Sequence, residues 1–129
     1  MDSMAPRAFI SYEMEDERAK DRLYSVMSGI SEVAFVNYAI ESEWDSSWKS
    51  RCAAMMRDTG GTVVLIGSTT HESESVLWEI AETRRQKHAL LAIQTGRGDR
   101  RHQVPAGVDS SEVIDWNPEL IATRLKTWS

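Results

Sequence analysis

Cysteine, histidine and long apolar runs are all scarce in this sequence of 129 residues. The single cysteine, Cys52, excludes an internal disulfide framework, and the three histidines lack the spacing of a metal site. No apolar stretch approaches the roughly 20 residues that a membrane span needs. The amino terminus also lacks the charged and apolar regions of a secretory signal. The sequence therefore predicts no metal, no membrane contact and a cytoplasmic location.

Positive charge is also scarce, since 15 Lys and Arg residues face 20 Asp and Glu residues, for a net charge of −5. This balance argues against a nucleic-acid binder, because phosphate contacts need clustered cations. One local cluster comprises Arg97, Arg100, Arg101 and His102. We interpret it as a solvated loop, with a phosphate-bearing ligand or partner as the alternative.

Several motifs of phosphate and acyl chemistry are absent. The chain has no GxxxxGK[ST] loop, no GxGxxG turn and no GxSxG nucleophile elbow. A phospho-receiver would carry an acid at the end of the third predicted strand, where this chain has Gly67 and Ser68. A flavodoxin would have a phosphate-binding loop after the first strand, whereas the segment SYEMEDE is acidic.

Short apolar runs alternate with amphipathic segments along the chain. The predicted strands are residues 7–11, 33–36, 62–66, 89–93 and 113–116, and the predicted helices are 16–28, 45–58, 75–87 and 120–128. Gly29 is placed to end the first helix in a left-handed conformation, and Asn117-Pro118 to start the last. This alternation predicts a single α/β domain over residues 1–129. We expect a five-stranded parallel flavodoxin-like sheet, in the order 2-1-3-4-5, with helices on both faces.

In such a sheet, ligands bind beyond the carboxyl ends of the strands where the strand order reverses, here between the first and third strands. The loops that open there are residues 11–16 and 67–74, with residues 37–45 at the flank. Glu79 lies in the helix that follows, about 130° from the centre of its core-facing stripe on a helical wheel. The stripe consists of Val76, Leu77, Ile80 and Ala81. Glu79 can therefore lean over the sheet edge as a catalytic acid or be an exposed helical acid, while Glu82 points to solvent.

The other candidates near this edge have structural alternatives. Tyr12 can stack on a flat ring or cover the edge of the core, and His71 can be a ligand or a solvated loop residue. Ser73 is a natural helix cap. Cys52 is interpreted as a packed thiol, and Trp78 as packed beneath a loop or at a subunit contact.

Three segments carry a resemblance to a known family: FISYEMEDERA, VVLIGSTTHESESVLWEI and VIDW. Together they resemble the TIR-like (Toll/interleukin-1 receptor-like) domains of bacteria and archaea, in the flavodoxin-like branch that includes the TIR subunit of Thoeris anti-phage systems. Catalytic members of that superfamily cleave the nicotinamide–ribose bond of NAD with a glutamate near the start of the helix after the third strand. The resemblance implies that Glu79 has this role. It further implies NAD contacts from Ser11, Tyr12, Asn37, Asp45, His71 and Ser73.

This resemblance implies an NAD-processing enzyme of anti-phage immunity, with NAD as substrate and no permanently bound cofactor. Its product would be ADP-ribose or a cyclic derivative, and a nucleotide messenger would reach an effector protein. One alternative is a non-catalytic TIR-like interaction module, with self-association as a possible mode of action. Another is a nucleotide or base transferase of related topology.

Overall fold

The elements of the fold come from a computed structural model, which describes residues 6–37, 47–96 and 100–128. The strands are β1 (Arg7–Ser11), β2 (Ala34–Val36), β3 (Gly61–Ile66), β4 (Ala89–Gln94) and β5 (Val113–Ile114). The helices are α1 (Glu17–Ile30), α2 (Trp48–Arg57), α3 (Glu74–Arg85) and α4 (Pro118–Lys126). Short 3₁₀ turns are η1 (Met14–Asp16), η2 (Thr70–Glu72) and η4 (Ser110–Glu112). Among the described helices, none combines the length and apolar character needed to cross a bilayer.

All five strands run parallel in the order β2-β1-β3-β4-β5, which confirms the predicted topology. The order reverses between β1 and β3, where Ser11 pairs in register with Val64. The carboxyl ends of these two strands therefore lie at the same edge of the sheet.

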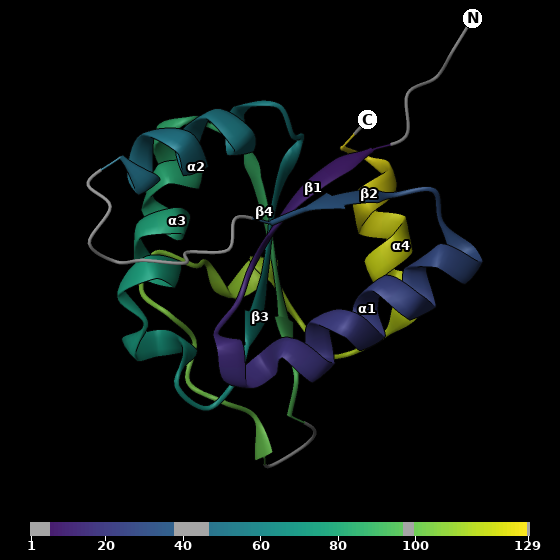
Figure 1. Ribbon diagram of the computed structural model, residues 1–129. Coiled ribbons are helices and arrows are strands. Elements are labelled where there is room, and N and C mark those ends of the chain that lie inside the picture. The colour runs from purple at the N-terminus through teal and green to yellow at the C-terminus, as the bar shows by residue number, and fades with distance from the viewer. Residues whose placement is uncertain (1–5, 38–46, 97–99, 129) are drawn as a thin grey trace, which may run out of the picture.

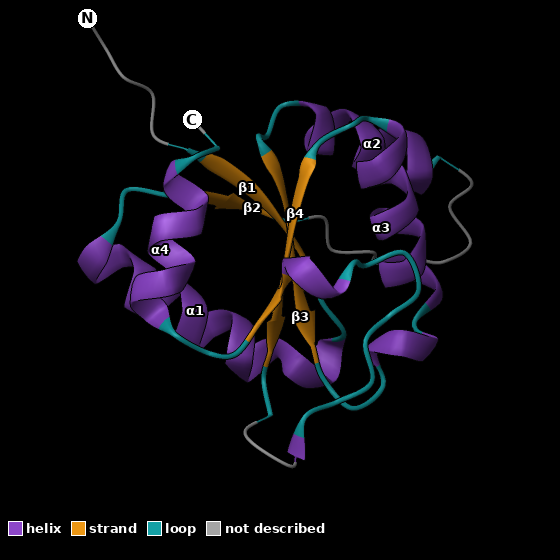
Figure 2. Ribbon diagram, turned by 180° about the vertical axis from the view of Figure 1, so that it is seen from behind, coloured by secondary structure: helices purple, strands orange, loops and turns teal. Residues whose placement is uncertain are grey.

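Helices cover both faces of the sheet, as predicted (Figure 1). The view from behind shows the same two layers, with α1 and α4 on one face and α2 and α3 on the other (Figure 2). Side chains of a strand alternate between the two faces. Val63 and Leu65 of β3 pack in the cluster formed with α1 and α4, whereas Val64 and Ile66 pack with α3. Both faces of the central strand are thus buried, as its uninterrupted apolar run indicated.

The helix ends follow the sequence in two cases and depart from it in one. Asn117 caps α4 by accepting from the backbone N–H of Leu120 at 3.1 Å. Ser73 caps α3 by accepting from the N–H of Val76 at 3.2 Å. The prediction for Gly29 is wrong, because α1 continues through it to Ile30. Ser31 is extended and leads directly toward β2, so this helix ends without a left-handed residue.

Candidate active site

Glu79 is placed by the anchoring of α3 on the sheet. The capping by Ser73 begins the helix at Glu74, so Glu79 falls in its second turn. One turn later, the hydroxyl of Thr83 lies 2.7 Å from that of Thr62 on β3 and donates to the backbone carbonyl of Glu79 at 2.8 Å. Because Thr83 and Thr62 are buried, this contact fixes the position of α3 along β3.

The carboxyl group of Glu79 is buried where β1, α2 and α3 meet. Its residue is 5% exposed. The hydroxyl of Ser11, at the end of β1, donates to Oε1 at 2.6 Å. The thiol of Cys52, on α2, donates to Oε2 at 3.4 Å. Each carboxyl oxygen therefore accepts a hydrogen bond from a different element.

Apolar side chains surround this group on the α2 side. Phe9, Cys52 and Met56 form a buried cluster, against which Trp48 and Trp78 pack. The two indole rings meet edge to face, with centroids 5.1 Å apart. The packed thiol predicted for Cys52 fits this cluster.

Burial in this setting shifts two titrations. Desolvation raises the pKa of Glu79 from the ordinary 4.5 to about 7, although the hydrogen bonds from Ser11 and Cys52 favour the ionised form. Desolvation also raises the pKa of the Cys52 thiol, and the adjacent negative charge of Glu79 raises it further. Cys52 is therefore a thiol donor at neutral pH, and Glu79 titrates near neutrality.

The buried face of α3 differs from the predicted stripe. Ala81 is exposed, so its assignment to the core is wrong. Glu82 is 5% exposed, which contradicts its predicted position in solvent. Its carboxylate accepts from Arg85 and from Gln86, whose amide also donates to the carbonyl of Ala53 on α2. The helical wheel assigned Ala81 and Glu82 to the wrong faces of α3, because this helix packs against α2 as well as against the sheet.

The remaining predicted site residues lie in different places. Tyr12 packs with the apolar cluster on the α1 and α4 face, opposite to Glu79, with the Lys20 ammonium 5.8 Å from its ring centroid. Ser73 is occupied as the α3 cap, and Asn37 is half-buried after β2. His71 lies in η2, with Nε2 3.6 Å from Glu72 Oε1. Its buried Nδ1 has no hydrogen-bond partner among the described residues.

Asp45 lies outside the described residues. Of the predicted set, the structure thus brings Ser11 directly onto Glu79. It also adds Cys52, which the sequence presented only as an apolar-face thiol. A residue on a neighbouring helix has no spacing relation to Glu79, so no sequence signal pointed to this contact.

The two loops at the switch point are joined by carboxylates. Glu15 accepts from the hydroxyls of Ser68 and Thr69 at 2.8 and 2.7 Å. The Asp16 carboxyl lies against Gly67, where an added Cβ would be 2.2 Å from Oδ2. Burial raises the pKa of Asp16. The acidic segment after β1 therefore binds the Ser/Thr-rich segment after β3.

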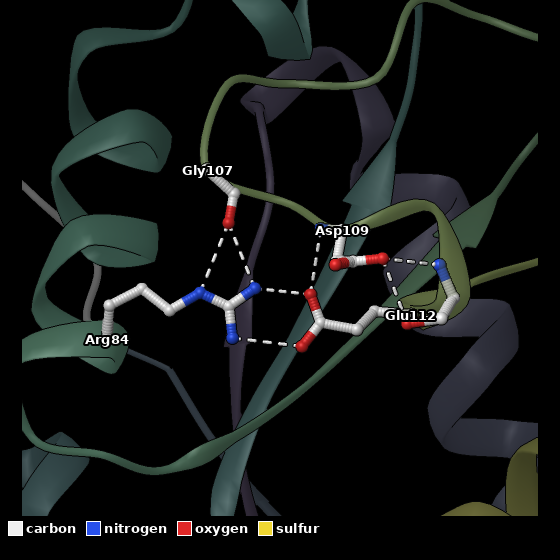
Figure 3. Close-up of polar contacts among 5 residues, drawn as sticks. Arg84, Gly107, Asp109 and Glu112 are labelled. Carbon is white, nitrogen blue, oxygen red and sulfur yellow. Dashed lines mark hydrogen bonds and ion pairs between the residues drawn. The ribbon is translucent and has the colours of Figure 1, made fainter.

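An arginine on the outer side of α3 fastens the long loop before β5 (Figure 3). Arg84 donates through Nε and Nη2 to the carbonyl of Gly107, at 3.1 and 2.9 Å, and through both terminal nitrogens to the Glu112 carboxylate. Asp109 orders the same turn by accepting from the Ser111 N–H at 2.9 Å. Gly107 has a φ of 92° and lies against Ile80 of α3. These contacts hold residues 107–112 against the helix that carries Glu79.

The basic cluster predicted near residue 100 is described only in part. Arg97 lies outside the described residues, while Arg101 pairs with Asp115 at 3.2 Å. The described part of the chain contains no group of three His, Cys, Asp or Glu residues placed to hold a metal ion.

Solved structures of TIR and SEFIR domains share this fold. The TIR domain of the Toll-related receptor TRR-2 from Hydra magnipapillata is 14% identical and has a TM-score of 0.60, with 91% of each chain covered. A prokaryotic SEFIR domain is also 14% identical, with a TM-score of 0.56 and coverage of 96% of this chain and 92% of that one. The sheet order and these likenesses define a TIR-like fold.

A family model assigns the chain more narrowly. The model described as "Thoeris protein ThsB, TIR-like domain" matches residues 9–99, and the chain belongs to this family. The matched segment contains Ser11, Cys52 and Glu79. A comparison with curated proteins finds no match.

Proposed function

We propose that this protein cleaves NAD at the bond between nicotinamide and ribose, with Glu79 as the catalytic carboxylate. The observation that carries the proposal is a buried carboxyl at the switch point of the sheet, on the helix after β3. The resemblance to catalytic TIR domains identifies the same helical position. Membership of the Thoeris TIR-like family supports this choice of substrate over other dinucleotides.

The chemistry needs little beyond such a group. When the C1′–N bond breaks, its electron pair leaves with nicotinamide and the ribose becomes an oxocarbenium-like cation. A carboxylate in a water-poor site stabilises this charge and can accept hydrogen bonds from the ribose hydroxyls. An ionised carboxylate offers about four lone-pair positions, of which Ser11 and Cys52 take two.

The fate of the cation defines the product. Capture by water gives ADP-ribose, and capture by a group of the same nucleotide gives a cyclic derivative. We propose that the product acts as a messenger for an effector protein in anti-phage defence, in the cytoplasm where NAD is available. Since the stabilising form is the carboxylate, turnover should rise as pH increases through about 7.

A second function is favoured by the closed packing around the same carboxyl group. Glu79 is 5% exposed and both its oxygens are already hydrogen-bonded, so a ribose can reach it only if covering side chains are displaced. If that displacement never occurs, the chain is a non-catalytic TIR-like module that acts by contacts with other TIR domains. Glu79 would then be a structural acid.

Nicotinamide release from NAD separates the two functions. The purified chain is compared with Glu79→Gln and with Glu74→Gln, which removes an exposed acid from the same helix. NAD is also measured in bacteria that express each form, with and without phage challenge, so that activation in the cell is sampled. We expect release by the native chain and Glu74→Gln, and a loss of at least about 100-fold in Glu79→Gln. Equal release by all three would overturn the role of Glu79, and no NAD loss in either setting would favour the module.

A further inference from the structure

We propose that Ser11 and Cys52 are positioning residues that hold Glu79 by one carboxyl oxygen each and so fix its orientation and proton occupancy. Their catalytic meaning rests on the proposed function. Ser11, which the family resemblance assigned to the nucleotide, acts here through the carboxyl group. Cys52 was predicted from the sequence only as a packed thiol.

The geometry of the two contacts is complementary. Ser11 reaches Oε1 from the last residue of β1, and Cys52 reaches Oε2 from the middle of α2. Both residues are at most 1% exposed, so neither donor exchanges its partner for water. A carboxyl held at both oxygens from two elements cannot rotate about its terminal bond without breaking one of the contacts. Its plane is therefore set by the distance between the sheet and α2.

The polar groups that face Glu79 are mainly these two donors. Toward it, β1 presents the hydroxyl of Ser11 and the apolar Phe9, and α2 presents the thiol of Cys52. The next buried acid on α3, Glu82, is neutralised by Arg85. Burial favours the protonated carboxyl, whereas the two donors favour the ionised one. Changing a donor should therefore change how readily the proton leaves, in a direction set by donor strength.

Three substitutions test this. Ser11→Ala and Cys52→Ala remove a donor, so the Glu79 titration midpoint should rise, by about one pH unit for the shorter serine contact and by less for the thiol. Cys52→Ser replaces a weak donor with a stronger one and should lower the midpoint. Ser28→Ala is the matched control. The exposed Ser28 hydroxyl donates to the backbone carbonyl of Ser25 within α1, so its removal should leave the Glu79 midpoint unchanged.

The midpoint is read by carbon-13 NMR of the side-chain carboxyl carbons, with the Glu79 signal identified by its loss in Glu79→Gln. This readout does not depend on turnover. The pH profile of nicotinamide release is then measured for the same variants, and its acidic limb should shift with the NMR midpoint. A merely structural role would lower the amount of folded protein without moving either midpoint.

The outcomes separate this inference from the proposed function. Midpoints that stay fixed, or that move in the same direction for Cys52→Ala and Cys52→Ser, would overturn the inference even if NAD is cleaved. Midpoints that shift as expected in a protein that causes no NAD loss, either when purified or in phage-challenged cells, would refute the proposed function and keep the assignment of the two donors to Glu79. Parallel shifts of midpoint and rate profile would support both.

Discussion

The buried carboxyl of Glu79 should leave a measurable mark on stability that does not depend on any substrate. A group whose folded pKa lies above its unfolded value binds its proton more tightly in the folded state. Its contribution to stability is complete below the unfolded pKa and is lost as pH rises through the folded one. For Glu79 these limits are 4.5 and about 7. The loss of stability should therefore fall between pH 4.5 and 7.

The size of the effect follows from the interval. Each pH unit is worth about 1.4 kcal/mol, so ionisation of Glu79 should lower the free energy of unfolding by about 3 kcal/mol between pH 4 and pH 8. Glu79→Gln keeps the shape of the side chain but cannot ionise. Relative to the native chain, this variant should become more stable by about 3 kcal/mol over the same range. Other titrating groups cancel in the difference, because both proteins contain them.

Urea unfolding, followed by the fluorescence of the five tryptophans at several pH values, measures this difference. Glu74→Gln is the control, since it removes an exposed acid and should show a difference that varies by less than about 1 kcal/mol with pH. A pH-independent difference for Glu79→Gln would show that the carboxyl ionises as freely in the folded chain as in the unfolded one. The buried site described above would then be incorrect.

Three further predictions concern the loop fastened to α3 and a glycine of α1. Gly107→Ala should destabilise the fold by about 1–2 kcal/mol, because Gly107 has a φ of 92° and an added Cβ would lie 2.9 Å from Ile80 Cγ2. Gly29 lies in α1 with open space around it, so Gly29→Ala should instead stabilise the fold by roughly 0.5–1 kcal/mol. Thermal unfolding of both variants measures these effects, and equal effects would contradict the prediction. Arg84→Gln should lower the free energy of unfolding by about 1–2 kcal/mol, because it breaks the contacts to Gly107 and Glu112. Backbone amide hydrogen exchange at residues 107–112 should become faster in Arg84→Gln. It should not change in the control Arg18→Gln, which alters an exposed residue of α1. Unchanged exchange in Arg84→Gln would argue that Arg84 does not hold the loop.

Much of the fold follows from local pattern. The apolar run of β3 requires burial on both faces, and alternating strands and helices require a parallel sheet. Capping side chains fixed the starts of α3 and α4, since Ser73 and Asn117 satisfy backbone N–H groups within their own turn. Gly29 shows the limit of such reasoning. A glycine near a helix end permits a left-handed stop, but the direction of the following chain decides whether one forms.

The site was also predicted only in part, because local pattern does not specify how a helix packs against its neighbours. Topology and resemblance located Glu79, and the residue that ends β1 was expected near it. The faces of α3 were misjudged, because a helical wheel assumes a single packing partner while α3 contacts both the sheet and α2. The pairing of Glu82 with Arg85 and Gln86 also makes a buried acid acceptable where the wheel expected solvent.

By itself, the sequence determined the order of elements, the parallel sheet and the acid at its switch point, because these depend on periodicity, caps and short connections. Only the tertiary structure decided what surrounds that acid. Ser11 and Cys52 come from β1 and α2, and their distances to Glu79 depend on how two layers pack. Packing is a property of volumes summed over distant segments, so no local pattern specifies that a thiol and a hydroxyl meet the same carboxyl group.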